Sequence, residues 1–518
     1  MRFLPIVALA LIGCAGSRPS PREPSVTVRE RSVESVHVAA GLRTGPHALS
    51  LEEASLLALE RHPELAVRRL DPAIAATFEQ LERAEFGVTL FADGQYQQEL
   101  SRETNRATMM QFDVEGSRTT AGLGLRQRLP TGTTLETALG LGRDESNRAP
   151  EQQEVRASLT LTQSLLRGLD PDVNLASVRQ AELERRASEH QLRAFVAALV
   201  LEMELAYWQL ALAQRSLRIH EESLTLAERE AEVAAERVAA GDLAPADLPV
   251  TRALVAQRRQ ALIDARAAAA AWRLRLGRML GLDPESSTLE LTDAIAIEPR
   301  PLDDPDAHRA LALRLRADLA EARARLAQNE LATVASGNGL LPRLDLFVQL
   351  AKTGFGSSFA EAVGAIGAPT YELTVGLSFE QLLGNDAATA THEAAQLRRE
   401  RAERAVENLE SLVLLDVGLA LNELARARAQ IEASRESAAE QARVVEAERE
   451  RVQAGESPPL LVAQAERDLV AARIAEIEAQ VAYRVALVSL YAAEGSLLPR
   501  RGVRLRGDEA VDLSPSRR

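Results

Sequence analysis

The chain has 518 residues, a formal net charge of −14 and only 3% aromatic residues. Alanine, leucine, glutamate and arginine dominate it, a composition typical of long helices that pack side by side as coiled coils. The acidic balance argues against nucleic acid as a partner. Phosphate binding needs a clustered basic surface, and the sequence has no basic run with interleaved aromatic residues.

The N-terminal residues, "MRFLPIVALALIGCAGSRPS", have the features of a bacterial export signal. After a short positive region, Phe3 to Ile12 are apolar but too few to span a bilayer as a helix. Leu11 to Cys14 resemble the bacterial lipobox, which predicts cleavage before Cys14 and diacylation of its thiol. Ala15, the next residue, resembles lipoproteins sent to the outer membrane. The alternative is an ordinary secretory signal with an incidental cysteine.

We therefore expect residues 1–13 to be a signal peptide and residues 14–49 to be a lipidated, flexible tether, since the latter lack a helical period. Cys14 is the only cysteine, so the chain can form no internal disulfide and no CxxC metal site. No segment after residue 14 has about eighteen consecutive apolar residues, so no transmembrane helix is predicted. Any membrane-spanning part would have to be a β-barrel.

The sequence contains two copies of one unit. "ALERHPELA" (Ala58–Ala66) matches "ALRLRADLA" (Ala312–Ala320) at an offset of 254 residues, whereas Gly241 matches Gly455 at an offset of 214. The difference between the two offsets means that the first copy contains about forty extra residues, which lie between residues 92 and 205. The predicted domains are a first repeat (50–281), a linker (282–304), a second repeat (305–493) and a C-terminal tail (494–518).

Each repeat has the same predicted order of helix, alternating strands, very long helix, turn and return helix. The long helices cover about 174–240 and 386–454, and each would be about 100 Å long. A helix of that length must pack beside other helices. The return helices, about 246–281 and 457–493, are half as long. A further helix near 305–337 could stack end to end on the first return helix.

The segments before the long helices alternate between apolar and polar residues, with the period of two expected for strands. Apolar residues on one face and small or polar residues on the other suit a barrel between lipid and a wet lumen. The alternative is a half-buried soluble sheet. Polar loops are predicted at 99–117 and 143–153, with a tight link at 130–133. The predicted strands are 88–97, 119–129, 134–142 and 155–163 in the first repeat, and 342–350 and 371–379 in the second.

The two turns between long and return helices share one pattern. Gly241 and Gly455 can adopt the left-handed conformation that ends a helix. Pro245, Pro458 and Pro459 can then begin the return helix, since proline is favoured in a first helical turn.

These features resemble the TolC-like outer-membrane efflux proteins over about residues 48–495. The resemblance rests on "LSLEEASLLALERHPELAVRRL", "LTLTQSLLRG", "AYWQLALAQ", and the turns in "ERVAAGDLAPADLPVTRALV" and "ERVQAGESPPLLVAQAERDLV". It implies a mainly α fold with a transmembrane β-barrel portion, in a homotrimer with one α-helical barrel and one shared β-barrel. It also implies a channel that docks to a periplasmic adaptor and an inner-membrane transporter.

The resemblance places both turns at the periplasmic tip, where the adaptor docks. Some members narrow this end with acidic residues just after the second turn. Here Leu461 and Gln464 occupy that stretch, so an acidic aperture ring would have to come from Asp247 in the first repeat.

The forty extra residues are enough for two more strands and one loop. We therefore predict six strands per protomer and about eighteen per trimer, against the twelve given by two strands per repeat. The rival is an extracellular hairpin above a twelve-stranded barrel.

The alternative function is a periplasmic coiled-coil adaptor or scaffold lipoprotein without a pore. The seven histidines have no HxxxH or HExxH spacing, and the sequence has no phosphate loop or nucleophile elbow. We therefore expect no enzyme activity, no metal and no cofactor.

Overall fold

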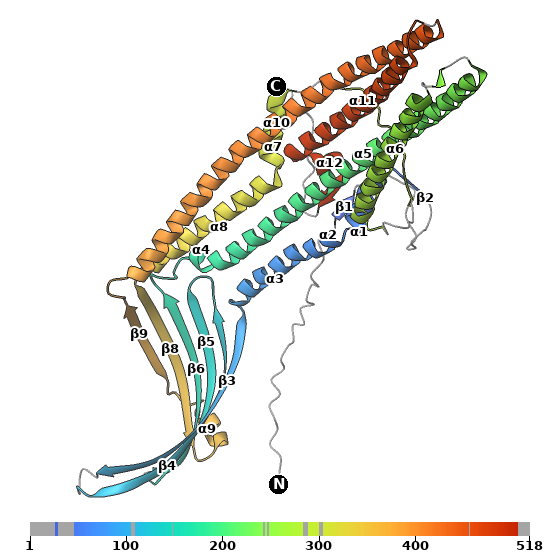
Figure 1. Ribbon diagram of the computed structural model, residues 1–518. Coiled ribbons are helices and arrows are strands. Elements are labelled where there is room, and N and C mark those ends of the chain that lie inside the picture. Colours follow the sequence, from blue (N-terminus) through green and yellow to red (C-terminus); the bar gives the residue numbers. More distant parts are fainter. Residues whose placement is uncertain are drawn as a thin grey trace, which may run out of the picture.

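The computed structural model describes residues 26–28, 46–104, 109–147, 149–241, 244–245, 248–282, 288–299, 304–454 and 456–505. The molecule is elongated, with long helices side by side at one end and a single large sheet at the other (Figure 1).

The first repeat begins with three short helices, α1 (Leu51–Arg61), α2 (Pro63–Arg68) and α3 (Leu70–Ala84). The long helix α5 (Ala176–Ala240) follows the sheet after the one-turn α4 (Pro171–Asn174), and α6 (Leu248–Met279) returns beside α5. The long helix and the return helix match the predicted segments.

The second repeat has the same plan. It contains α7 (Pro305–Leu315), α8 (Ala317–Gly339), the long α10 (Asp386–Gln453) and the return helix α11 (Pro459–Ala493). Even the helix starts correspond at the offset of 254. Ser50 accepts a hydrogen bond from the Glu53 amide at the start of α1, and Asp304 accepts one from the Asp306 amide at the start of α7.

The end-to-end stacking differs from the prediction. The helix predicted at 305–337 is broken at Arg316 into α7 and α8. In space, α8 continues the line of the second return helix, α11, because Gly495 at the end of α11 lies against the backbone of Leu315 just before α8. The first return helix α6 ends at Gly281 against Arg61 instead. Each return helix therefore meets the short helices of its own repeat. The prediction was wrong because helix length alone cannot choose between two partners of similar length.

The strands form one antiparallel sheet in the order β3-β4-β5-β6-β8-β9, so the prediction of six strands per protomer is confirmed. Its second and third strands, β4 and β5, are the forty-residue insertion of the first repeat. A short helix, α9 (Phe359–Ala365), connects β8 to β9. The strands are β3 (Val88–Thr104), β4 (Gln111–Arg128), β5 (Thr133–Ser146), β6 (Ala149–Ser164), β8 (Arg343–Gly356) and β9 (Glu372–Glu380).

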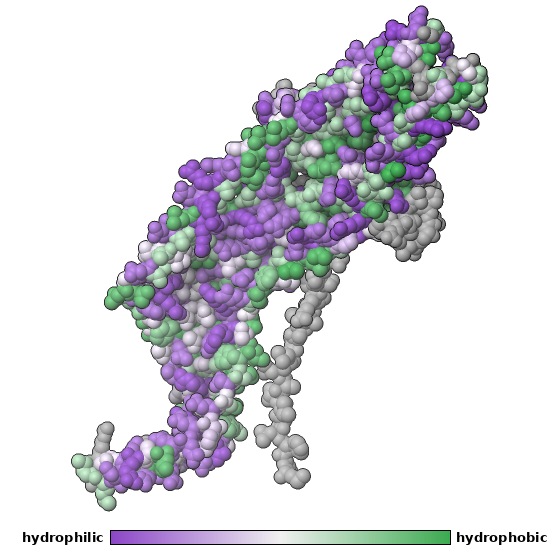
Figure 2. All heavy atoms as spheres, in the orientation of Figure 1, coloured by the Kyte–Doolittle hydropathy of each residue, from purple (hydrophilic) through white to green (hydrophobic). Residues whose placement is uncertain are grey.

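The predicted polar loops at 99–117 and 143–153 are mostly strand. Polar residues stay in the ladder there because they pair across strands, as Arg102 and Asp113 do at 2.7 Å. The β3–β4 hairpin extends beyond the other strands and is largely hydrophilic on its visible face (Figures 1 and 2).

Two small sheets lie beside the helices. β2 (Pro46–Leu49) pairs in parallel with β7 (Thr288–Leu291), and β1 (Val26–Val28) pairs with β10 (Val503–Leu505) after the one-turn α12 (Leu497–Arg500). The predicted tether, linker and tail therefore each contain ordered strands. The tail was misjudged because Leu497, Leu498 and Val503 are buried against α5.

One helix among the described residues, α5, contains a stretch apolar and long enough to cross a membrane, but 56% of that stretch is buried inside the protein. Val200, Met203 and Tyr207 of this helix are fully buried in two core clusters. The apolar stretch is therefore the core of the helical layer.

Candidate functional site

The sheet has one continuous apolar face. In register across it, Leu90 pairs with Leu125, Leu159 with Leu350, and Leu350 with Leu373. These side chains are 42–62% exposed. An apolar patch that extends over six strands is too large for a surface left in water. We call this side of the sheet the apolar face.

The opposite side, the polar face, carries ion pairs between strands, two of them between the neighbours β4 and β5 and one between β6 and β9 across the intervening β8. They fix the register and bring opposite charges together on this face. The pairs are Arg126–Glu136 at 2.8 Å, Arg118–Asp144 at 2.8 Å and Arg156–Glu372 at 2.7 Å.

Glycines also lie on the polar face, where aromatic rings cover two of them. A Cβ added at Gly124 would lie 2.4 Å from the ring of Phe91, and one added at Gly376 would lie 2.4 Å from the ring of Phe347. The rings lie over the neighbouring strand because glycine leaves room there. Neither phenylalanine was predicted as a functional residue, although both interrupt an otherwise polar alternation.

Both sides of the molecule end in unpaired edges. β3 and β9 are the edge strands of the sheet, and among the described strands neither has a second partner. In the helical layer, α3 packs on α5, α5 on α8 and α8 on α10, which leaves α3 and α10 outermost. Each of these two helices exposes large apolar side chains: Leu70, Ile74, Phe78 and Leu81 on α3, and Leu397, Leu412, Leu415 and Leu419 on α10.

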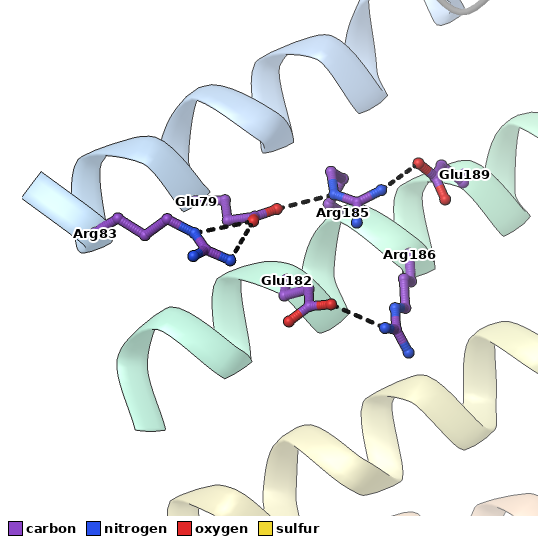
Figure 3. Close-up of polar contacts among 6 residues, drawn as sticks. All are labelled: Glu79, Arg83, Glu182, Arg185, Arg186 and Glu189. Carbon is purple, nitrogen blue, oxygen red and sulfur yellow. Dashed lines mark hydrogen bonds and ion pairs between the residues drawn. The ribbon is translucent and has the colours of Figure 1, made fainter. Parts of the chain in front are cut away.

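Ion pairs fix α3 on α5 near the sheet (Figure 3). Glu79 of α3 accepts hydrogen bonds from Arg83 of its own helix and, at 2.9 Å, from Arg185 of α5. Burial raises the pKa of Glu79, but its bonds to the two arginines outweigh burial and lower the pKa overall. Arg185 also binds Glu189 at 2.6 Å, so this contact stays charged near neutral pH.

The two helical turns lie together at the end of the molecule far from the sheet (Figure 1). Gly241 has φ +85° and ends α5, as predicted. Pro245 is exposed in the loop before α6. Asp247 lies outside the described residues, so the acidic ring remains a prediction.

The second turn follows α10. The Glu456 amide after it donates to the Arg451 carbonyl at 2.8 Å. Gly455 lies outside the described residues, so its left-handed conformation remains a prediction. Pro458 precedes the first helical residue of α11, Pro459.

A charged cluster joins all four helices near the turns. Arg449 of α10 binds the buried carboxylate of Glu466 on α11 and lies 3.5 Å from Glu230 of α5. The buried Arg258 of α6 attracts both carboxylates. Burial, the charge of Glu466 and a hydrogen bond to it raise the pKa of Glu230 to about 7. No sequence pattern predicts this cluster, since Glu and Arg occur on every helical face.

Cys14, the predicted lipidation site, also lies outside the described residues. Among the described residues, no group of three His, Asp or Glu side chains could hold a metal ion.

Comparison with protein families gives one match. The family model for outer membrane efflux proteins matches residues 55–282 and 309–496. No curated protein matches the chain.

Several solved structures share the fold. The outer-membrane channel OprN has a TM-score of 0.63 and 17% identity, covering 92% of this chain and 98% of its own. The open state of the MtrE outer membrane channel from Neisseria gonorrhoeae has a TM-score of 0.62 and 18% identity, covering 92% and 97%. The CmeC outer membrane channel from Campylobacter jejuni has a TM-score of 0.62 and 14% identity, covering 89% and 90%.

Proposed function

This chain belongs to the outer membrane efflux protein family, and we propose that three copies form one conduit from the periplasm to the exterior. The sheets close into a barrel in the outer membrane, and the helices form a tunnel below it. The observation that carries this proposal is the sheet itself, which is apolar on one face, polar on the other and continuous with long helical hairpins.

The open edges indicate how the copies join. The edge strand β9 of one copy pairs with β3 of the next, which leaves no free strand edge in the lipid. In the helical layer, the exposed leucines of α10 pack against the apolar stripe of α3 on the neighbouring copy. Each contact uses two different surfaces, and such head-to-tail contacts form a closed ring when the rotation between copies closes, as proposed here for three copies.

Six strands from each of three copies give an eighteen-stranded barrel. The apolar face then contacts lipid, and the polar face with its glycines and paired charges lines the lumen. The rival arrangement, a hairpin above a twelve-stranded barrel, would hold β4 and β5 outside the lipid. The strand β5 carries the apolar residues Leu135, Leu139 and Leu141 in register with its neighbours.

The family acts in transport, and the adaptor and the inner-membrane transporter are proposed partners of the turn end. Gly241 and Gly455, with Pro245, Pro458 and Pro459, would form the docking rim. Gly241→Val should abolish export while trimers still form, because a Cβ there meets nothing within 4 Å and strains only the local backbone. Loss of the trimer would contradict a docking role. Export assays and native gels separate the two outcomes.

We further propose that diacylated Cys14 anchors each copy in outer-membrane lipid. Two or more acyl chains give stable attachment where one gives little. Mass spectrometry of the mature N-terminus should find acylated Cys14. A free thiol or cleavage elsewhere would exclude the anchor.

The barrel is tested by single cysteines on adjacent residues of β5, in a chain with Cys14→Ser. Leu139→Cys, on the apolar face, should react with a lipid-soluble maleimide and resist a charged one. Ala138→Cys, its matched control on the polar face, should do the opposite. Reaction of both cysteines with only the charged reagent would place β5 outside the membrane and support the twelve-stranded rival.

A further inference from the structure

The chain contains a single lysine, Lys352, among sixty-one basic residues. It lies on β8, in register with Ala157, on the apolar face of the sheet. The four preceding positions on that face of β8 are all apolar: Leu344, Leu346, Val348 and Leu350. Lys352 is therefore the first charge at the end of the apolar band that lies away from the helices.

The position of this charge restricts its depth in the membrane. A lysine on the lipid face costs about 2–4 kcal/mol at the middle of the bilayer but only about 0–1 kcal/mol near its surface. Lys352 makes no ion pair with the described residues. Its flexible stem can lie along apolar surface while the ammonium reaches the headgroups.

A tyrosine lies at the same level of the sheet. The apolar face of β9 carries four apolar residues, Leu373, Val375, Leu377 and Phe379. At the end of this row away from the helices, just before the strand begins, lies Tyr371, which is 72% exposed. Tyr371 directly precedes Glu372, the partner of Ala351, and so comes beside Lys352. Tyrosine at the end of an apolar band is typical of a bilayer surface.

The short helix α9 lies just beyond Lys352, on the same face. A Cβ on Gly354 would lie 1.9 Å from the carbonyl oxygen of Ala362, so the helix backbone rests directly on the strand. This contact also buries Val155 of the adjacent strand. The outer side of α9 exposes Phe359 and Val363. Beyond Lys352, the exposed apolar side chains on this face therefore belong to α9, which packs on top of the sheet.

We propose that Lys352, with Tyr371 and α9 on either side of it, binds the phosphate of an anionic outer-leaflet lipid. The acyl chains would lie along Leu350 and Leu373, and α9 would lie at headgroup level. The proposal rests on the proposed barrel. It places one lipid contact on each copy, on β8 next to the edge strand β9.

The unique lysine makes a direct test possible. Trimers are reconstituted in phosphatidylcholine vesicles with and without lipid A, and treated with a water-soluble amine-reactive ester. Lys352 labelling is read by peptide mass spectrometry. An ammonium bound to phosphate stays protonated and unreactive, so labelling should be about five-fold slower with lipid A, the effect expected of one basic residue at an anionic surface.

Two controls make the result specific. Ser378→Lys in a Lys352→Arg background places the amine on the polar face of β9 and should label equally in both vesicles. Inorganic phosphate added to phosphatidylcholine vesicles should not protect Lys352. Protection by inorganic phosphate alone, or equal labelling of Lys352 in both vesicles, would overturn the proposal.

A second measurement does not depend on labelling. Lipid A retained by purified trimers, measured as phosphate, should fall with Lys352→Gln and persist with Lys352→Arg. Equal retention in both variants would contradict the site. If Leu139→Cys reacts from the lipid phase while Lys352 is unprotected, only this proposal fails. If Leu139→Cys also fails to react, the barrel itself is wrong.

Discussion

The two repeats share backbone geometry at the ends of their return helices but differ in the side-chain contact made at Glu204. Each return helix ends at a glycine with positive φ, Gly281 at +63° and Gly495 at +72°, which are 214 residues apart. Each glycine lies against the end of the repeat's first helix, at Arg61 and Leu315, which are 254 residues apart. The contact between a return helix and the first helix of its repeat therefore occurs in both copies, with its two sides related by the two sequence offsets.

Side-chain contacts differ between the repeats. Glu204 of the first repeat is fully buried and binds Arg501 of the C-terminal segment through two hydrogen bonds of 2.5 and 2.6 Å. The equivalent position in the second repeat is Gly418, where a Cβ would meet nothing within 4 Å. A backbone conformation is required wherever the unit folds, whereas a side-chain partner depends on neighbours that differ between the copies.

The largest loss of stability is expected from substituting the glycine that ends each return helix. Gly281→Val and Gly495→Val each add a Cβ at positive φ, less than 3 Å from backbone or Cβ atoms that cannot move freely. A left-handed backbone costs about 1–2 kcal/mol and overpacking about 1–3 kcal/mol more. Urea unfolding of the trimer should show similar losses for both variants.

Gly502→Ala is the matched control. Gly502 also has positive φ, at +71°, but a Cβ there meets nothing within 4 Å. It should lose only the backbone part, about 1–2 kcal/mol. If Gly281→Val and Gly495→Val cost no more than Gly502→Ala, the close contact at the helix ends has no role in stability.

Features set by local sequence and by the comparison of the two repeats were the ones that could be predicted. Period and duplication gave the long helices, the six strands and the left-handed Gly241, because each follows from local chemistry. The left-handed Gly281 and Gly495 could have been found in the same way, since they share the offset of 214 residues.

Contacts between distant residues could not be predicted. Glu204 and Arg501 are 297 residues apart, and nothing in either neighbourhood distinguishes them from other Glu and Arg residues. The charged cluster around Glu230 could not be predicted for the same reason. Nor could the helix and strand after residue 494, because the few apolar residues of this segment were interpreted as part of a tail.

Removing Arg501 tests the unshared contact. Arg501→Met leaves the fully buried Glu204 without its partner, and breaking a buried pair in this way costs about 3 kcal/mol or more. The double variant Glu204→Gln with Arg501→Met should recover much of this loss, because no charge remains buried. Urea unfolding gives both values. A double variant as unstable as the single one would mean that packing, not charge, fixes this segment.

The helix caps provide a smaller comparison. Ser50→Ala and Asp304→Ala each remove one capping acceptor at equivalent helix starts, at an expected cost of about 1 kcal/mol. The loss should be slightly larger for Ser50→Ala, since the Ser50 hydroxyl also donates a hydrogen bond to Glu53 at 2.9 Å. Thermal unfolding of the two variants measures both losses of stability. A much larger loss for Asp304 would break the equivalence of the two starts.

The smallest effect concerns the contact between the repeats near the turns. The folded pKa of Glu230, about 7, lies above its ordinary value of 4.5, so its contribution is fully present below pH 4.5 and is lost as the pH rises through 7. Above pH 7, Glu230 and Glu466 both carry charge and repel, with Arg449 and Arg258 offsetting part of that repulsion. Spin labels at Val233 and Leu461, exposed sites on α5 and α11, should therefore show a broader distance distribution at pH 8 than at pH 5. Glu230→Gln keeps the hydrogen bond to Glu466 without the titration, so its distribution should stay narrow at both pH values. A response of the same size in Glu230→Gln would assign the pH dependence to other groups.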